Sequence, residues 1–338
     1  MKSPDRGSPS RMRDCGPIEE GLFVEINGME QWITIRGKDR RNPALLMLSG
    51  PGFAYSPMTP FFAPWEESYM LVQWDQPGAG ATYAKNGAEG TGALTLNRLT
   101  RDGLALAELL KERFDLGPIS LFGVSAGTII GLKLIRERPD LFAGYAGNGQ
   151  VVNWARQEAL SYAMILDRAR KAADTAAITE IEQLGPPPWS DVASVAVKAK
   201  YANVMTPAEQ AAFAANSQAI TGGYHSPPAD ASYFPKGLAA FDPMTRATKA
   251  FAELKHEIER FDARALGLTF DVPVILLQGE EDAHTVTAEV EAYAGEITSP
   301  HTVLELIPGA GHASSFLRGE MLALLDKHLR PLVVDPRA

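Results

Sequence analysis

Hydrophobic residues in the first 147 positions gather in short continuous runs. Runs that are each long enough for one buried strand lie at residues 44–48, 69–74, 119–122 and 141–146. Two β-rich runs, at residues 22–26 and 31–36, precede them and are joined through Asn27-Gly28, which favours a tight hairpin turn. Residues 96–114 instead carry leucines at helical spacing with charges between them. The pattern predicts a hairpin followed by strands that alternate with helices.

The pattern changes after residue 147. Up to about residue 267 the sequence favours Ala-rich helices, at 154–184, 190–205, 207–220 and 238–265, interrupted by Gly185-Pro186-Pro187-Pro188 and by a loop at 222–237. Strand patterns return at 272–278 and 302–307, and a last helix is predicted over 315–329.

Strands that alternate with helices predict an α/β fold, in which a mostly parallel sheet is covered by helices on both faces. The helical block interrupts the sheet pattern, so we expect it to form a cap over the carboxyl ends of the strands, where open α/β sheets bind ligands. The expected organisation is a disordered extension over residues 1–20, a core built from 21–147 and 266–334, and a helical cap domain over 148–265.

Composition narrows the class of protein. The chain has 338 residues, of which 45% are hydrophobic and 22% charged, as in an ordinary globular protein. A net charge of −9 argues against nucleic-acid binding, because no basic surface is available to displace phosphate counterions. The single cysteine, Cys15, excludes a disulfide framework and fits a reducing compartment, so we expect a cytoplasmic protein.

We expect no membrane span and no secretory signal, because no run approaches about 18 apolar residues and the N-terminus has no apolar stretch. The sequence carries no signal for an oligomeric state.

A glycine-flanked turn joins a predicted strand to a predicted helix at residues 118–139. The apolar run of the strand is followed by the turn Gly123-Val124-Ser125-Ala126-Gly127. Apolar residues then recur at helical spacing, and Pro139 ends the predicted helix. Gly-x-Ser-x-Gly between a strand and a helix predicts a nucleophile elbow, with Ser125 as the nucleophile. Glycines allow strand and helix to close around a strained serine. The N–H of Ala126, at the start of the helix, can face the charge that develops during acyl transfer.

A serine hydroxyl needs a base within hydrogen-bond reach, and the base needs an acid that orients it. His312 is the predicted base, because it follows the last strand on the glycine-rich loop 308–311. Asp282 is the predicted acid among three that follow a buried strand, because its short side chain has little rotamer freedom; the competitors are Glu280 and Glu281. The chain order of Ser125, Asp282 and His312 fits this hydrolase geometry and differs from that of the two common endoprotease folds.

The sequence positions of the other five histidines indicate a catalytic role less strongly than that of His312. His284, two residues after Asp282, is expected to line the cleft and receives no role; His225 lies in a cap loop and stays open. The remaining three fit surface or packing positions: His256, His301 and His328.

The loop after the third strand, Ser49-Gly50-Pro51-Gly52, is expected to supply the second oxyanion donor. We assign this donor to the N–H of Gly50, because Pro51 has none and instead stiffens the loop. Aromatic residues near the predicted mouth suggest an apolar pocket, although they fit a hydrophobic core equally well: Phe53, Tyr55, Phe61, Phe62 and Trp154.

Taken together, these motifs resemble the α/β-hydrolase superfamily and, within it, the proline iminopeptidase-like (S33-type) group of serine peptidases, over about residues 20–332. Residues 48–52 stand where that group has His-Gly-Gly-Pro-Gly, and residues 72–80 resemble its Asp-Gln-Arg-Gly-x-Gly segment. The elbow, Gly279-Glu280-Glu281-Asp282 and Gly311-His312 match its nucleophile, acid and base motifs. The resemblance implies Ser125 as nucleophile with Asp282 and His312, an oxyanion hole formed by Gly50 and Ala126, and a helical cap that shapes the substrate pocket.

The sequence departs from that group at several positions. Leu48 and Ser49 replace the histidine and the first glycine of the signature loop, Pro77 replaces or shifts a glycine, and Ala126 replaces a tryptophan that commonly follows the serine. Such enzymes also use cap carboxylates to hold the free amino group of the substrate. The predicted cap does carry acids, and most of them fall among helical charges that indicate solvated faces; the acids are Glu158, Glu180, Glu182, Glu209, Glu253, Glu257 and Glu259. Proline specificity therefore does not carry over.

The favoured function is a cofactor-free serine hydrolase that cleaves a small ester or amide through an acyl-enzyme. One alternative is an aminopeptidase that releases an N-terminal proline or another small residue, so the expected partner is a small molecule or a short peptide. A second is a non-catalytic binding protein of hydrolase fold, which the altered loop at Leu48-Ser49 keeps open. No metal is expected, because His256 and Glu253 form a single Glu-x-x-His without a second copy. The glycine-rich loops also lack the lysine of a phosphate-binding loop.

Overall fold

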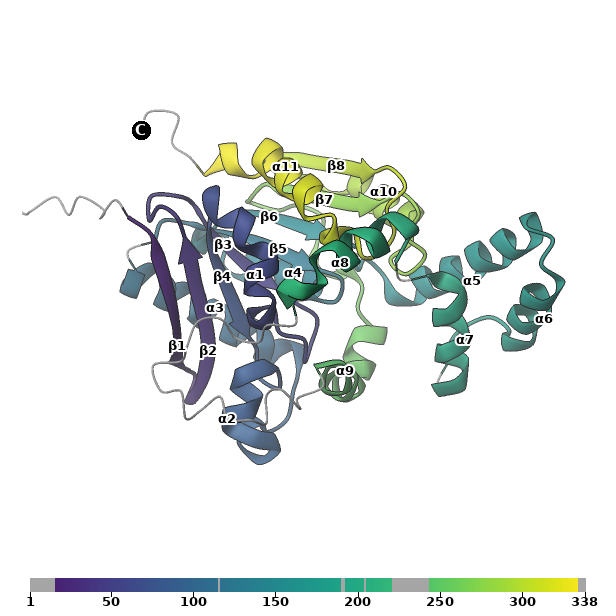
Figure 1. Ribbon diagram of the computed structural model, residues 1–338, viewed down its shortest axis with the longest axis horizontal. Helices are drawn as coiled ribbons and strands as arrows, with labels where there is room; N and C mark the ends of the chain where they lie inside the picture. Colours follow the sequence, from purple (N-terminus) through teal and green to yellow (C-terminus); the bar gives the residue numbers. More distant parts are fainter. Residues whose placement is uncertain (1–15, 115, 190–191, 204, 221–242, 334–338) are drawn as a thin grey trace, which may run out of the picture.

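An eight-stranded sheet forms the centre of the protein, with strand order β1-β2-β4-β3-β5-β6-β7-β8 (Figure 1). The computed structural model describes residues 16–114, 116–189, 192–203, 205–220 and 243–333. The strands are β1 (Ile18–Ile26), β2 (Met29–Gly37), β3 (Ala44–Leu48), β4 (Met70–Asp75), β5 (Ile119–Val124), β6 (Phe142–Asn148), β7 (Val274–Gly279) and β8 (Thr302–Ile307). β2 pairs antiparallel with β1 and with β4, and every pairing from β4 to β8 is parallel.

Alternate residues of the buried strands face two separate hydrophobic cores. In β3, Leu46 and Leu48 belong to one core, and Leu45 and Met47 to the other. The first core includes residues of α3 (Leu96–Phe114), α4 (Gly127–Glu137) and α10 (Thr287–Glu296). The second includes residues of α1 (Thr59–Phe62), η2 (Ala63–Glu67) and α11 (Arg318–His328). The prediction of a mostly parallel sheet covered on both faces is therefore confirmed.

In the described part of the chain, five α-helices lie between β6 and β7, where the helical block was expected. They are α5 (Trp154–Lys171), α6 (Thr175–Leu184), α7 (Val192–Ala202), α8 (Pro207–Ile220) and α9 (Pro243–Glu259). The predicted single helix over 154–184 is two helices, because the chain turns after Lys171 and Asp174 caps α6 by accepting the N–H of Ala177. The predicted loop at 222–237, with His225, lies outside the described residues.

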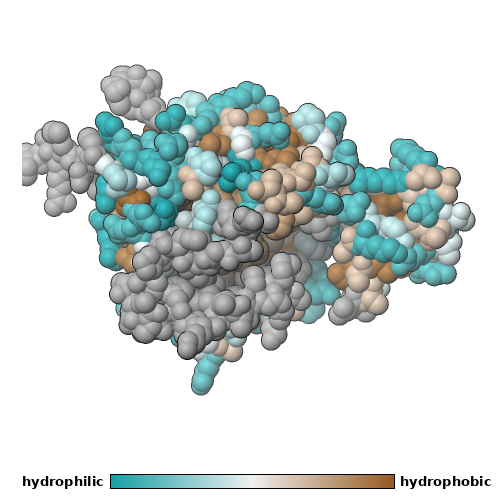
Figure 2. Space-filling view, in the orientation of Figure 1, coloured by the Kyte–Doolittle hydropathy of each residue, from teal (hydrophilic) through white to brown (hydrophobic). Residues whose placement is uncertain are grey.

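These helices do not form one layer. α5, α6 and α7 surround a small core of their own and project away from the sheet (Figure 1). α9 instead contributes Ala250, Leu254 and Ile258 to the first sheet core. α8 packs against α1 and against η6 (Ser314–Phe316), and Figure 2 shows weakly hydrophobic residues along it, as its Ala-rich sequence requires.

The N-terminal boundary differs from the prediction. β1 begins at Ile18, so the last three residues of the extension expected over 1–20 belong to a strand. The difference has a simple cause: β1 is an edge strand that begins Ile18-Glu19-Glu20, and its charged residues hide the strand pattern. Residues 1–15, including Cys15, lie outside the described part of the chain. Among the helices that are described, none has the length and apolar character needed to cross a membrane.

Candidate active site

Ser125 occupies a strained turn between β5 and α4. Its φ of +52° lies in the left-handed region, which residues with a side chain seldom adopt. Three hydrogen bonds hold this conformation. The Ser125 N–H donates to the carbonyl of Asn148 at 2.9 Å, and the Ser125 carbonyl accepts from the N–H and the hydroxyl of Thr128 at 2.9 and 2.6 Å. The turn therefore projects the serine from the carboxyl end of a central strand.

Close backbone packing explains the two glycines of the motif. A Cβ on Gly127 would lie 2.2 Å from the carbonyl oxygen of Leu48 in β3. A Cβ on Gly123 would lie 3.1 Å from the carbonyl oxygen of Gly127. A side chain at either position would therefore push apart the helix and the strands that hold Ser125.

Ser125, His312 and Asp282 form one hydrogen-bonded chain. Ser125 Oγ lies 2.9 Å from His312 Nε2, and His312 Nδ1 lies 2.9 Å from Asp282 Oδ2. Asp282 follows β7 and His312 follows β8, so adjacent parallel strands bring both residues to one edge of the sheet. The two loops are also joined directly, because the N–H of Glu281 donates to the carbonyl of Ala310 at 2.8 Å. The structure thus brings together the three residues that the sequence analysis selected.

Asp282 is fully buried and surrounded by donors. Its Oδ1 accepts the N–H groups of His284 and Thr285 at 2.7 and 2.9 Å, and its Oδ2 accepts the Thr285 hydroxyl at 2.6 Å. Burial alone would raise the pKa of Asp282, but the charge of His312 and these hydrogen bonds outweigh it and hold the pKa well below its usual range. Glu280 and Glu281, the competing acids, are exposed.

An ionised Asp282 settles which nitrogen of His312 can act as a base. A carboxylate only accepts hydrogen bonds, so the Nδ1 that faces it carries the proton. The Nε2 of the neutral ring is then an acceptor, and it faces the hydroxyl of Ser125. Chemically, the arrangement is suited to taking a proton from the serine.

Gly50 and Ala126 lie side by side next to the turn. A Cβ on Gly50 would be 3.6 Å from the Cβ of Ala126. The loop is held by hydrogen bonds from the Phe53 N–H to the Gly50 carbonyl at 3.1 Å, from the Ser49 hydroxyl to the Phe53 carbonyl at 2.5 Å, and from Gln76 Nε2 to the Ser49 carbonyl at 3.1 Å. Within the described part of the chain, neither the Gly50 N–H nor the Ala126 N–H donates a hydrogen bond. Both donors are therefore available to a bound oxygen atom.

A buried cation lies close to these residues and was not identified from the sequence. Lys198 of α7 is only 7% exposed, and its Nζ lies 3.0 Å from Glu158 Oε1 and 3.4 Å from His284 Nδ1. The ring of His284 lies 5.0 Å from the ring of His312. Burial, together with the charges of His312 and Lys198, lowers the pKa of His284 to about 2, so this ring is neutral at physiological pH.

Glu209 of α8 is also buried here, whereas the sequence predicts solvated faces for most of the cap acids. Its carboxylate accepts the N–H of Thr206 at 2.7 Å and the N–H of Gly311 at 2.8 Å. The Glu209 N–H in turn donates to the Thr206 hydroxyl at 3.4 Å, which completes a capping box. The Thr-x-x-Glu spacing is the sequence signal that identifies this helix start. Glu182, by contrast, is exposed and pairs with Arg170.

The remaining candidates lie elsewhere. Tyr55, Phe61 and Phe62 are buried in the second sheet core, which favours the core interpretation of these aromatic residues; Phe53 and Trp154 are half-buried. His328 pairs with Glu305 at 3.0 Å, and His301 is exposed. In the described ranges, no three His, Cys, Asp or Glu side chains are grouped as metal ligands.

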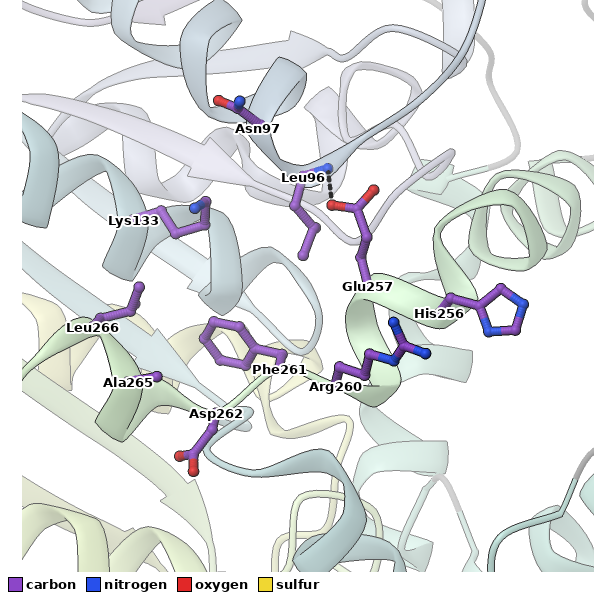
Figure 3. Close-up of a pocket in the computed structure, with 10 residues that line it drawn as sticks. All are labelled: Leu96, Asn97, Lys133, His256, Glu257, Arg260, Phe261, Asp262, Ala265 and Leu266. Atoms are coloured by element: carbon purple, nitrogen blue, oxygen red, sulfur yellow. Dashed lines mark hydrogen bonds between the residues drawn. The ribbon is translucent and has the colours of Figure 1, made fainter.

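His256 lines a separate groove of about 410 Å³ between α3, α4 and the end of α9 (Figure 3). There the neighbouring Glu257 accepts the N–H of Leu96 at 3.1 Å and so caps the start of α3. None of the residues that line this groove is one of the predicted site residues.

Comparison with known proteins yields three kinds of match. The model of the family described as serine aminopeptidase, S33 matches residues 62–316. The probable aminopeptidase YbaC of Bacillus subtilis is 26% identical over 320 residues, which cover 91% of this chain and 95% of the relative.

Solved structures of similar fold include the proline iminopeptidase-related protein of Thermus thermophilus, with a TM-score of 0.59, 17% identity and coverage of 93% of this chain and 99% of the other. A thermophilic esterase from Thermogutta terrifontis has a TM-score of 0.54, 17% identity and coverage of 94% and 99%.

Proposed function

Because the chain belongs to the serine aminopeptidase S33 family of α/β-hydrolase enzymes, we propose that it is a serine hydrolase that cleaves a small ester or amide through an acyl-enzyme. This membership confirms the resemblance drawn from the motifs. The family is compatible with small-molecule and peptide substrates, so the reaction must be inferred from the site.

The hydrogen-bonded chain from Ser125 through His312 to Asp282 carries the proposal. Ser125 Oγ attacks the carbonyl carbon of the substrate while its proton moves to His312 Nε2. Asp282 keeps the Nδ1–H in place and stabilises the positive charge that forms on the ring. The bond to the leaving group then breaks, and the leaving oxygen or nitrogen takes the proton from Nε2.

The N–H groups of Gly50 and Ala126 support the same reaction. Both lie next to Ser125 without another acceptor in the described residues, so they can donate to the oxyanion of the tetrahedral intermediate. Water then attacks the acyl-enzyme, with His312 as the base, and Ser125 recovers its proton as the acid is released. Each step uses groups that this chain itself supplies.

We further propose that residues 148–265 act as the cap of this site. Two observations support this role. Lys198 of α7 contacts His284 beside His312, and Glu209 of α8 contacts the residue that precedes His312. Side chains from the insertion therefore reach the loops that follow β7 and β8.

An aminopeptidase is the second candidate, and the name of the Bacillus subtilis relative favours it. Such an enzyme needs a carboxylate that is available to a substrate ammonium group. In the described part of the insertion, the two cap carboxylates at the site already have partners, because half-buried Glu158 pairs with Lys198 and buried Glu209 accepts two backbone N–H groups. We therefore favour the esterase or amidase over the aminopeptidase.

Two assays test these proposals. A fluorophosphonate should label wild-type protein at Ser125 and leave the Ser125→Ala variant unlabelled, and failure to label folded wild-type protein would contradict the serine mechanism. A panel of p-nitrophenyl esters and aminoacyl anilides then separates the candidates. Turnover of anilides with negligible turnover of esters would reject the leading version and support the aminopeptidase.

A further inference from the structure

Glu209 links the helical insertion to the loop that carries His312. It lies in the first turn of α8, has no exposed surface, and joins two backbone segments. Its Oε2 accepts the N–H of Thr206 at 2.7 Å, and its Oε1 accepts the N–H of Gly311 at 2.8 Å. Gly311 is 102 residues away in sequence and directly precedes His312. One buried carboxylate therefore connects the start of α8 to the neighbour of the proposed base.

The fit between α8 and this loop is close at two points. A Cβ on Gly311 would lie 3.1 Å both from Glu209 Oε2 and from Thr206 Cγ2. Further along α8, the ring of Phe213 packs edge-on against Phe316 at 5.1 Å. The helix thus contacts the loop just before His312 and again four residues after it, and Glu209 makes the polar contact.

The setting of Glu209 combines burial with hydrogen-bond donors. Both partners of the Glu209 carboxylate are backbone N–H groups, and such donors suit an ionised carboxylate. Burial raises the pKa of Glu209, its hydrogen bonds oppose this, and the negative charge of Asp282 adds to the rise. The elements that pack on α8 are α1, η1 (Ser56–Met58) and η6, and their sequences TPFF, SPM and SSF contain no titratable side chain. The titratable groups on the facing loops, which follow β7 and β8, are Glu280, Glu281, Asp282, His284 and His312.

We propose that Glu209 is a positioning residue for the reaction, which holds the His312 loop so that Nε2 stays within hydrogen-bond distance of Ser125 Oγ. This inference rests on the proposed serine mechanism. Without the carboxylate, the buried N–H of Gly311 loses its acceptor, and the loop must move to satisfy it. A displacement of about 1 Å at a catalytic group can reduce turnover about 100-fold.

The experiment compares Glu209→Gln with two matched variants. Glutamine keeps the shape but has one acceptor oxygen, so its amide group faces one of the two N–H donors. Gln210→Ala changes an exposed neighbour whose Nε2 donates to the Met205 carbonyl at 3.1 Å. Phe213→Leu loosens α8 and leaves the carboxylate in place. Thermal unfolding establishes that each variant is folded.

We expect kcat on a p-nitrophenyl ester to fall about 10- to 100-fold in Glu209→Gln, with KM within about threefold of wild type, because the group acts on the base and not on substrate binding. The acid limb of the pH profile should also move to lower pH, since a negative charge near the His312 loop is lost. Gln210→Ala should match wild type, and Phe213→Leu should retain most of kcat. If Phe213→Leu loses as much kcat as Glu209→Gln, or if Glu209→Gln keeps wild-type kcat, the proposal is wrong.

Amide hydrogen exchange tests the same contact without relying on activity. The peptide that contains Gly311 and His312 should exchange faster in Glu209→Gln than in wild type and Gln210→Ala. Unchanged protection would overturn the positioning role even in an active enzyme. Failure of wild-type protein to react with a fluorophosphonate, with faster exchange in the variant, would instead contradict the serine mechanism and leave the structural link in place.

Discussion

Replacing Gly127 by alanine would place a methyl group at the point where α4 meets the end of β3. The new Cβ would lie 2.2 Å from the Leu48 carbonyl oxygen, 2.8 Å from the Leu48 carbonyl carbon and 2.9 Å from the carbonyl carbon of Ser49. All three are backbone atoms, so no side chain can rotate away. The start of α4 and the end of β3 must therefore move apart.

The size of the effect follows from these distances. Non-bonded heavy atoms rest at about 3.5 Å, so the backbone segments must move apart by about 1 Å. Overpacking of this kind usually costs about 1–3 kcal/mol of unfolding free energy. The segments that move carry Gly50 and Ala126, whose N–H groups form the proposed oxyanion hole. A misplacement of about 1 Å predicts a loss of about 100-fold in kcat/KM.

Thermal unfolding and p-nitrophenyl ester hydrolysis measure the two consequences. We expect the midpoint of Gly127→Ala to fall by about 1–4 °C, together with the loss of turnover. Gly295→Ala is the matched control, because this glycine is exposed in α10 and a Cβ there meets nothing within 4 Å. It should keep wild-type turnover and gain up to about 1 kcal/mol of stability. A Gly127→Ala variant with the wild-type midpoint and turnover would refute the argument.

Three further changes have expected outcomes. The pKa of Asp282 is lower in the folded than in the unfolded chain, so at pH values between the two pKa values the unfolded chain binds more protons and stability falls as pH falls. Asp282→Asn should therefore lose less of its thermal midpoint than wild type below about pH 4, and an equal pH dependence would argue against this account. Lys198→Met leaves Glu158 without its cation, and we expect a loss of about 3 kcal/mol in urea denaturation that a second change, Glu158→Gln, partly restores. A double variant no more stable than Lys198→Met would contradict the pairing. Glu289 is fully buried and bonds Arg264 at 2.6 Å, so Glu289→Ala should lower the unfolding free energy by about 3 kcal/mol with little change in kcat, whereas a selective loss of kcat would contradict a purely structural pair.

The fold and the three linked residues could be predicted because their signals are local. Ser125, Asp282 and His312 each follow a short apolar run and lie in a turn with a glycine within three residues. In a parallel sheet, the loops after adjacent strands meet at one edge, so strand order alone brings such residues together. The Asn27-Gly28 turn is another local signal, and both residues adopt positive φ as a tight hairpin requires.

The contacts of the insertion could not be predicted in the same way. Glu209 and Lys198 meet partners that are 102 and 86 residues away in sequence. α8 is Ala-rich on all sides, so its hydrophobic pattern does not indicate which face becomes buried. A carboxylate on such a helix looks solvated until the helix is placed against another element. The aromatic residues Tyr55, Phe61 and Phe62 fitted a pocket or a core until the packing assigned them to the core.

By itself, the amino-acid sequence determined the order of strands and helices, the glycine-flanked turn at Ser125 and the choice of Asp282 and His312. These depend on backbone preferences and on hydrophobic periodicity, which act between neighbours along the chain. Only the tertiary structure decided that Glu209 and Lys198 are buried beside the loops that follow β7 and β8. Their burial depends on where whole helices pack, and that is a property of the assembled surfaces and not of any one segment.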